Sequence, residues 1–317
     1  MFVILLVEVI PMKKLLVIDG NALLHRAYHA LPDFKSKDGI PTNAVYGFAS
    51  VLYKVREDLQ PTHVCVCFDT PAPTFRDKMY KDYRAHRPEV EKELIQQFPI
   101  AREFLNAAGI RFYEQDGVEA DDLIAAIARK ARKIHLQTII LSGDRDLFQL
   151  IDDETFVLTP ALGFSKGLLY TRDEVVKKFG LPPEKIADLK ALTGDPSDNY
   201  KGVKGIGPKT AVDLIQQFGS VEKLYQHVQE VEPERIRTLL LSDKEHALLS
   251  KKLAVLKADI NIPVEQFLFT EYPESLRTFF HTYTFYSLER RYFQHQAHPP
   301  KSSSTPSKRA QDQLGLF

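Results

Sequence analysis

Short apolar runs that lead into aspartate recur along the first half of the chain. The runs at residues 15–18, 64–68 and 138–141 are followed, within three residues, by Asp19, Asp69 and Asp144. A run of four or five such residues without polar alternation is typical of a strand buried on both faces of a sheet. Because segments of helical periodicity separate these runs, the pattern predicts an α/β fold built on a parallel, doubly wound sheet.

Helices are predicted wherever apolar residues recur at a spacing of three and four. In the first half they fall at residues 44–59, 94–108 and 118–131, with one further short strand at 110–113. Gly109 directly follows the second helix, where glycine commonly ends helices. After residue 171 only helices are predicted, at 171–179, 184–192, 210–218, 220–228 and 243–256. The second half is therefore expected to be a helical region that packs on the α/β half.

Carboxylates gather where the strands end and where the helix at 118–131 begins. Seven of them share these positions: Asp19, Asp69, Glu119, Asp121, Asp122, Asp144 and Asp146. The carboxyl ends of parallel strands form one edge of the sheet, where such folds bind ligands. An acidic helix start alone has a simpler explanation, because the helix dipole favours negative charge. Crowded carboxylates, however, raise one another's pKa unless a cation joins them, and we therefore interpret the group as a metal site.

The chemistry of these ligands indicates the kind of metal. A set of carboxylate oxygens without His or Cys suits hard cations such as Mg²⁺ or Mn²⁺. Two ions about 3.5–4 Å apart can activate a water and stabilise the leaving oxygen of a phosphodiester. Asp195 and Asp198 are candidates for the same site, although their surroundings, Gly-Asp-Pro-Ser-Asp-Asn, are equally compatible with an ordinary turn.

A basic and aromatic segment spans residues 74–88, after the strand that leads to Asp69. Five Lys or Arg residues alternate there with Phe75, Tyr80 and Tyr83. Basic side chains attract phosphates, and aromatic faces stack on unpaired bases. A solvated, charged helix is the commoner form of such a run. Its position beside the acids nevertheless favours an arch that handles substrate, at about residues 70–92.

A glycine-rich segment, residues 202–211, separates two predicted helices. It differs from a P-loop because Pro208 intervenes between the last glycine and the lysine, and because no strand is predicted before it. A helix-hairpin-helix turn fits better, since glycines permit close backbone approach and free N–H groups can face a DNA phosphate. A plain glycine-rich connector is the alternative, but Lys201, Lys204 and Lys209 favour DNA binding.

Composition limits the remaining possibilities. Lys plus Arg and Asp plus Glu are equal at 42 each, so a nucleic-acid surface has to be local rather than global. Cys65 and Cys67 lack zinc-ligand spacing and are interpreted as core residues in a reducing, cytoplasmic compartment. The apolar residues 1–11 are too short to span a bilayer and are interpreted as an upstream extension before Met12, with no membrane partner expected.

Taken together, these motifs resemble the bacterial 5′–3′ exonuclease and flap endonuclease family, similar to the N-terminal nuclease domain of DNA polymerase I. The resemblance runs in family order from about Lys13 to about Phe293. It rests on these segments: Val17-Ile18-Asp19-Gly20, Ala44-Val45-Tyr46-Gly47-Phe48, Phe68-Asp69, Phe75-Arg76, Tyr83-Arg84-Ala85-His86-Arg87, Glu119-Ala120-Asp121-Asp122, Gly143-Asp144-Arg145-Asp146-Leu147, Gly194-Asp195-Pro196-Ser197-Asp198-Asn199 and Gly202-Val203-Lys204-Gly205-Ile206-Gly207.

The resemblance implies a PIN-like parallel sheet flanked by helices, a helical arch and a helical helix-hairpin-helix region. It implies two Mg²⁺ or Mn²⁺ ions held by nine acids: Asp19, Asp69, Glu119, Asp121, Asp122, Asp144, Asp146, Asp195 and Asp198. Arg84 and Arg76 are implied as catalytic residues. Arg84 stands where the family more often has Lys, and it cannot donate a proton near neutral pH. DNA contacts are implied for Tyr28, Phe75, Lys81, Tyr83, Arg87, Lys201, Lys204, Gly205, Gly207, Lys209 and Thr210, with K⁺ held at the helix-hairpin-helix turn.

The implied activity is two-metal hydrolysis of DNA at 5′ flaps, nicks or gaps, in primer removal and repair near the nucleoid. A non-catalytic DNA-junction binder or clamp-associated scaffold, and a PIN-type RNase, are the competing functions. The expected organisation is an extension at 1–11, a nuclease core at 12–170, a helical region at 171–295 and a disordered tail at 296–317. We expect a monomer, with a separate DNA polymerase as one partner.

The tail resembles the peptide by which bacterial proteins bind the replication sliding clamp. That peptide is usually written Gln-Leu-(Ser/Asp)-Leu-Phe, and Gly315 replaces its third residue here, at some entropic cost. The implied clamp-binding residues are Gln313, Leu314, Leu316 and Phe317. A frayed apolar terminus is the alternative.

Overall fold

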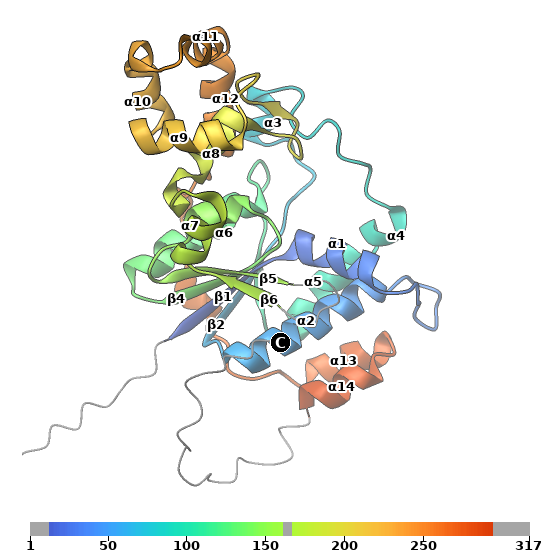
Figure 1. Ribbon diagram of the computed structural model, residues 1–317. Coiled ribbons are helices and arrows are strands. Elements are labelled where there is room, and N and C mark those ends of the chain that lie inside the picture. Colours follow the sequence, from blue (N-terminus) through green and yellow to red (C-terminus); the bar gives the residue numbers. More distant parts are fainter. Residues whose placement is uncertain (1–12, 161–166, 294–317) are drawn as a thin grey trace, which may run out of the picture.

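The computed structural model describes residues 13–160 and 167–293, and its centre is a six-stranded sheet (Figure 1). The strand order is β3-β2-β1-β4-β5-β6. The strands are β1 (Lys14–Asp19), β2 (His63–Cys67), β3 (Arg111–Tyr113), β4 (Gln137–Leu141), β5 (Thr155–Pro160) and β6 (Gly167–Tyr170). The predicted parallel arrangement is confirmed from β3 to β5, whereas β6 pairs antiparallel with β5 and makes the sheet mixed.

The central strands are apolar throughout because each face of the sheet has its own core. In β1, Leu16 and Ile18 join one cluster, and Leu15 and Val17 join the other. The first cluster is covered by α1 (Gly20–Ala30), α2 (Asn43–Leu59) and α5 (Gln97–Ala107), and the second by α6 (Ala120–Lys133). Alternate residues of a strand point to opposite faces, so a strand between two cores cannot show polar alternation.

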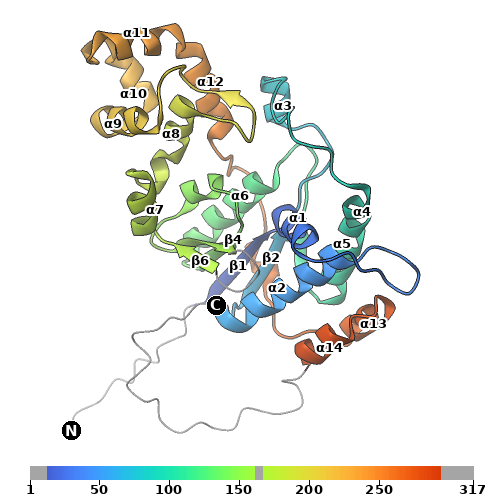
Figure 2. The ribbon, with the colours of Figure 1, turned by 45° about the vertical axis from the view of Figure 1, so that its right-hand side comes forward.

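The helical region forms a separate group with its own core. It comprises α8 (Ile186–Thr193), α9 (Pro208–Phe218), α10 (Val221–Gln226), α11 (Glu234–Ser242) and α12 (Lys244–Ala254). Helix α7 (Arg172–Phe179) precedes this group and packs on the second core of the sheet through Val175 and Phe179. Helices α8 to α12 lie on one side of the sheet, near α3 (Phe75–Met79), in both ribbon views (Figures 1 and 2). A hairpin of two short strands, β7 (Gly194–Asp195) and β8 (Tyr200–Lys201), follows α8.

The last two helices, α13 (Ser275–Thr282) and α14 (Tyr286–Phe293), return to the α/β half. They pack on α5 and α2, where the Tyr292 hydroxyl donates to the carbonyl of Ala49 at 2.6 Å. The expected helical region at 171–295 is therefore divided between two places in the fold. No helix in the described part of the chain is both long and apolar enough to cross a membrane.

The arch, predicted to be helical at about residues 70–92, is helical only in part. Helix α3 has five residues and α4 (Lys92–Ile95) has four, and the residues between them form turns and extended chain. The Thr74 side chain caps α3, while Asp77 accepts from the Thr74 backbone at 2.6 Å. Helix α3 ends at Met79 because the next residues turn back so that Tyr83 and Arg84 reach the acidic edge of the sheet.

Candidate active site

The ends of β1 and β4 meet through the carboxylate of Asp19. One oxygen of this side chain accepts from the backbone of Ala22 at 2.9 Å and caps α1. The other accepts from the hydroxyl of Ser142, just after β4, at 2.9 Å. The same Ser142 oxygen accepts from the backbone of Asp144 at 3.0 Å. This short network fixes two of the predicted acids side by side at the carboxyl edge of the sheet.

Asp69 joins the end of β2 to the start of α6. Its carboxylate accepts from the backbone of Ala120 at 2.7 Å, and its own backbone donates to the Asn21 side chain at 3.0 Å. The free N–H groups of a helix start favour such an anion. The contact places Asp121, one residue further along α6, next to the acids of the strands.

The resulting strand-end cluster, Asp19, Asp69, Asp121 and Asp144, is electrostatically strained. Burial, then the charges of Asp69 and Asp144, raise the pKa of Asp19 to about 7. Burial raises the pKa of Asp121 well above its usual value, with further increases from Asp144, Asp19 and Asp69. Burial also raises the pKa of Asp144. Carboxylates this crowded become stable as anions when a cation lies among them.

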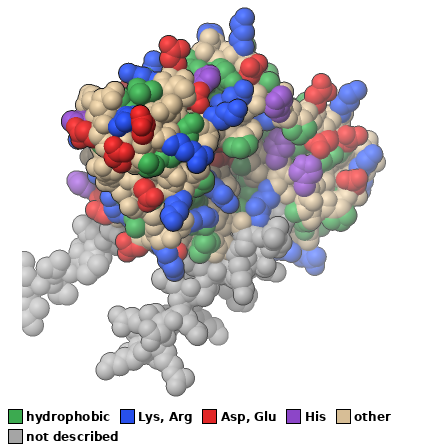
Figure 3. Space-filling model, turned by 45° about the horizontal axis from the view of Figure 1, so that its top comes forward, with side chains coloured by type: hydrophobic (Ala, Val, Ile, Leu, Met, Phe, Trp, Pro, Cys, Tyr) green, Lys and Arg blue, Asp and Glu red, His purple; other side chains and the backbone are tan. Residues whose placement is uncertain are grey.

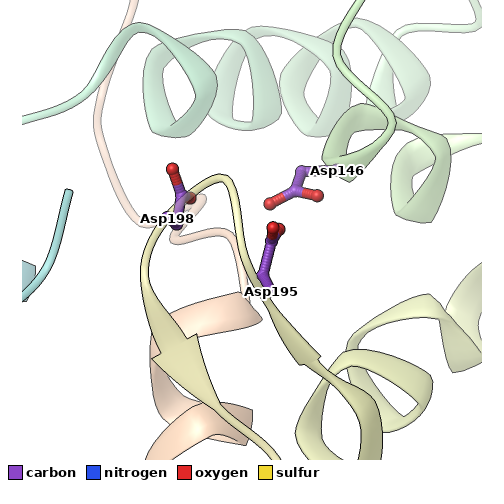
Figure 4. A group of neighbouring side chains, drawn as sticks. All are labelled: Asp146, Asp195 and Asp198. Atoms are coloured by element: carbon purple, nitrogen blue, oxygen red, sulfur yellow. The ribbon is translucent and has the colours of Figure 1, made fainter. Parts of the chain in front are cut away.

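A second group, the loop cluster, consists of Asp146, Asp195 and Asp198. These side chains are buried, and one oxygen from each lies within 4.8 Å of the other two (Figure 4). Asp146 begins the 3-10 helix after β4, whereas the other two come from the turn between β7 and β8. Asp195 also accepts from the backbone of Ser197 at 2.8 Å, as a turn residue does. The turn and a ligand set are therefore both present, and the turn geometry presents the carboxylates.

Lys190, which the sequence did not single out, lies in the loop cluster. Its ammonium group contacts Asp146 and lies 2.5 Å from Asp195. Burial alone would raise the pKa of Asp195, but Lys190 and Ser197 hold it below its usual value. The ammonium of Lys190 stabilises two of these carboxylates, and the cluster offers the oxygen donors that a hard divalent ion requires. The sequence gave no signal of this role, because Lys190 lies among the mostly apolar residues of a predicted helix.

Asp122 and Arg76 differ from their predicted roles as metal ligand and phosphate contact. Asp122 is buried, and both its oxygens accept from Arg76, at 2.8 and 3.1 Å. It also accepts from the backbone of Lys257 at 2.7 Å, while Arg76 donates to the carbonyl of Leu253 at 2.8 Å. These contacts enclose the guanidinium and join α6, α3 and the end of α12 with the segment that follows it.

Arg84 and Arg87 connect the arch to Asp198 of the loop cluster, and Arg84 also contacts Glu119 at the start of α6. Arg84 lies 3.0 Å from Glu119 and donates to Asp198 at 3.1 Å, and Arg87 donates to Asp198 at 2.6 Å. Glu119 is buried; burial raises its pKa, and Arg84 and Arg76 oppose that rise. Glu119 therefore forms ion pairs with arginines and is not a member of the strand-end cluster.

The predicted aromatic contacts fall into two kinds. Tyr83 is 6% exposed, and its hydroxyl donates to Asp198 at 3.1 Å, so its ring supports the arch instead of offering a face to a base. Tyr28 and Phe75 are half-buried, and the ammonium of Lys257 lies 3.3 Å from the centre of the Phe75 ring. Lys81 is exposed.

The glycine-rich loop leads from β8 into α9. The two-residue strand β8 does precede it, contrary to prediction, but in an antiparallel hairpin rather than in the βα unit of a P-loop. Gly205 has a φ of 86°, which favours glycine, and Gly207 caps α9 with Pro208 as the first helical residue. Lys201, Lys204 and Lys209 are exposed and Thr210 is half-buried. On the face of the molecule that Figure 3 shows, Lys and Arg side chains border a hollow.

Comparisons with known proteins cover almost the whole described chain. The family model described as "5'-3' exonuclease, N-terminal resolvase-like domain" matches residues 14–180, and "5'-3' exonuclease, C-terminal SAM fold" matches residues 181–274. DNA polymerase I of Bacillus subtilis is 44% identical over 252 residues, which are 80% of this chain and 29% of that protein. The chain thus spans less than a third of the polymerase's length.

Further matches agree with these. A 5'-3' exonuclease of Aquifex aeolicus is 38% identical over 80% of this chain and 86% of its own length. A structure of the bacteriophage T5 D15 flap endonuclease with DNA and metal ions has a TM-score of 0.64, at 22% identity over 77% of this chain and 89% of that one. The catalytic core of Rad2 with DNA has a TM-score of 0.62, at 17% identity over 89% and 92%. The chain belongs to the 5′–3′ exonuclease family of nucleases.

Proposed function

We propose that this protein hydrolyses phosphodiester bonds of DNA at 5′ ends and 5′ flaps, with divalent cations held at its acidic edge. The observation that carries the proposal is the convergence of carboxylates from β1, β2, the end of β4, the start of α6 and the turn between β7 and β8. Mg²⁺ and Mn²⁺ suit this set, because all the converging side-chain donors are carboxylate oxygens.

The strand-end cluster would hold one ion through Asp19, Asp69, Asp121 and Asp144, and the loop cluster a second through Asp146, Asp195 and Asp198. When bound, such ions lower the pKa of a water and stabilise the leaving oxygen. The chain's own residues position these acids: Ser142 orients Asp19, and Ser197 orients Asp195. Lys190 contacts Asp146 and helps to hold the pKa of Asp195 below its usual value.

Arg84 and Arg87 would exchange partners when DNA binds. Both are partly accessible, at 21% and 47% exposed, and both currently pair with Asp198. A phosphate could take their donors while a cation takes the carboxylate, since both exchanges preserve charge balance. Arg84 then stabilises negative charge at the phosphate without transferring a proton. Arg76, enclosed beside Asp122, acts by positioning α3.

Duplex DNA would contact the glycine-rich loop. Its backbone N–H groups, the start of α9 and three exposed lysines offer a phosphate-binding surface without base specificity. Backbone carbonyls of the same loop would hold K⁺. A nuclease with both surfaces recognises structure rather than sequence, which suits 5′ flaps, nicks and gaps in primer removal and repair.

Two partners complete the proposal, a separate DNA polymerase and the replication sliding clamp. The clamp-binding residues Gln313, Leu314, Leu316 and Phe317 lie outside the described residues. A tail that binds the clamp would act as a tether. It would raise the local concentration of this monomeric nuclease at DNA near the nucleoid.

The deciding experiment compares three substrates in Mg²⁺: a 5′-flap duplex, a nicked duplex and single-stranded RNA. Mapped cuts on the first two and none on RNA are expected. Binding of the flap without any cut, in Mg²⁺ and in Mn²⁺, would support the non-catalytic junction binder, and cutting of RNA alone would support a PIN-type RNase. Omission of the metal is the matched control.

A further inference from the structure

A groove between α2 and the β5–β6 end of the sheet is left open by the helices. It has a volume of about 460 Å³, within the range of ligand-binding clefts. Buried apolar side chains line it, including Val51 and Val55 of α2, Leu141 of β4 and Leu158 of β5. It contains none of the metal-site acids, so the nuclease site does not account for it.

Two polar groups of this groove have no partner among the described residues. The Ser50 hydroxyl oxygen is buried without a hydrogen bond, although buried hydroxyls are nearly always bonded. Arg291 of α14 lines the groove, is exposed and forms no ion pair with the described residues. A suitable occupant therefore combines apolar side chains with an anion and a hydrogen-bond acceptor.

We propose that the groove binds the chain's own segment 312–317. This segment carries Leu314, Leu316 and Phe317 for the apolar lining and Asp312 for Arg291. The amide oxygen of Gln313, or a backbone carbonyl beside it, accepts from Ser50. The segment thus supplies each kind of group that the groove lacks, within six residues.

The place where the described chain ends makes this docking accessible. Helix α14 lies beside α2 in both ribbon views (Figures 1 and 2). The rings of Tyr53 and Tyr292 are 4.9 Å apart, and Arg291 is only two residues before Phe293. A flexible linker as long as the segment between Phe293 and Asp312 has a root-mean-square span of about 25 Å. Such a tether gives an effective concentration on the order of millimolar, so a weakly binding segment would still occupy the groove.

The chain contains no tryptophan, which allows a direct test. In the full chain carrying Phe317→Trp, the new indole is the sole tryptophan. We expect its emission to be blue-shifted, and its acrylamide quenching to be roughly two-fold weaker or more, relative to a free peptide 308–317 with the same substitution. The weaker quenching follows from the high occupancy that the tether provides.

A charge reversal tests the site. Arg291→Glu changes an exposed side chain, and circular dichroism checks that the variant stays folded. It should return the emission towards that of the free peptide, and adding Asp312→Arg should restore the blue shift. The proposal would be overturned if the full chain with Phe317→Trp alone emitted like the free peptide. It would also be overturned if Arg291→Glu left the blue shift unchanged. A blue shift that grows with protein concentration would assign the groove to a second copy. None of these measurements depends on clamp binding or cleavage.

Discussion

Arg76 and Asp122 form an enclosed bidentate ion pair, with nitrogen–oxygen distances of 2.8 and 3.1 Å and exposed fractions of 2% and 1%. Asp122 directly follows Asp121 of the strand-end cluster in α6. Because α3, α6 and the segment after α12 all contribute to it, the pair fixes the base of the arch relative to the acids. Of the acids at the start of α6, Asp122 is thus held by Arg76, whereas Asp121 belongs to the strand-end cluster.

The first prediction concerns this pair. Asp122→Ala removes the bidentate partner of the buried Arg76 guanidinium and leaves it only Glu119, 3.3 Å away, so the metal-free protein should lose about 3–5 kcal/mol of unfolding free energy. Arg87→Ala removes the exposed member of an ion pair, and it should lower the unfolding free energy by less than about 1 kcal/mol. Urea denaturation in EDTA measures both. Unchanged stability of Asp122→Ala, together with a large loss of Mn²⁺ affinity, would instead make Asp122 a ligand.

The second prediction separates catalysis from binding. Asp144→Asn together with Asp146→Asn removes one carboxylate from each cluster, so cleavage of a 5′ flap in Mg²⁺ should be abolished. Catalysis depends on the geometry of the ions, whereas DNA binding rests mainly on distant phosphate contacts and should largely remain. Electrophoretic mobility shifts and product mapping measure the two. Cleavage near the unsubstituted rate would show that these clusters are not the catalytic site.

The third prediction follows from the raised pKa of Asp19, about 7 in the folded protein against roughly 3.9 for an unperturbed aspartate. A raised folded pKa contributes stability that is complete below pH 4 and is lost as the pH rises through 7. The metal-free protein should therefore melt at a lower temperature at pH 8 than at pH 5.5.

Mn²⁺ should reverse this trend, since a bound cation favours the charged carboxylates. Its stabilising effect should be larger at pH 8 than at pH 5.5, as measured by differential scanning fluorimetry. Asp19→Asn is the matched control and should flatten the dependence on pH. An equal effect of Mn²⁺ at both pH values would argue against a metal at this cluster.

The sequence was informative where local pattern determines structure. The apolar runs of β1, β2 and β4 predicted buried parallel strands, because a strand between two cores has no polar face. The acids that follow these strands were predicted to share one edge, and the structure places Asp19, Asp69 and Asp144 there. Family membership followed from the same residues in the same order.

Contacts between distant segments were not predictable in this way. The start of α2 is capped by the Gln97 side chain, which accepts from Ala44 and Val45 more than fifty positions earlier. Arg76 is enclosed because it donates to Leu253, 177 positions away. A basic residue in a charged run is expected to be solvated, and only the tertiary fold buries it. The role of Lys190 was missed because its contacts with Asp146 and Asp195 also arise only in the tertiary fold.

The fourth prediction concerns the glycine-rich loop. Gly205→Val forces a branched residue into a left-handed conformation, with its Cβ 3.2 Å from Leu239, and should weaken duplex binding at every sequence tested. Gly219→Val is the control for backbone distortion, because Gly219 also has a left-handed φ, of 84°, but lies at the other end of α9, outside the loop. Fluorescence anisotropy at moderate salt measures both. Normal binding by Gly205→Val would make the loop a connector.

The last prediction concerns the tail as a clamp ligand. A peptide of residues 308–317 should bind purified bacterial sliding clamp with a roughly micromolar Kd, as expected for a short segment that orders on docking. Its Leu314, Leu316 and Phe317 would fill an apolar groove on the clamp, and Gln313 would hydrogen-bond at the rim. A peptide with Leu316→Ala and Phe317→Ala is the matched control in fluorescence anisotropy, and equal signals from the two would contradict the assignment.

Because the isolated peptide lacks α2 and α14, its affinity for the clamp is measured without competition from the groove. In the full chain, Arg291→Glu should then increase clamp affinity if the two sites share the segment, since the tail would no longer be held in cis.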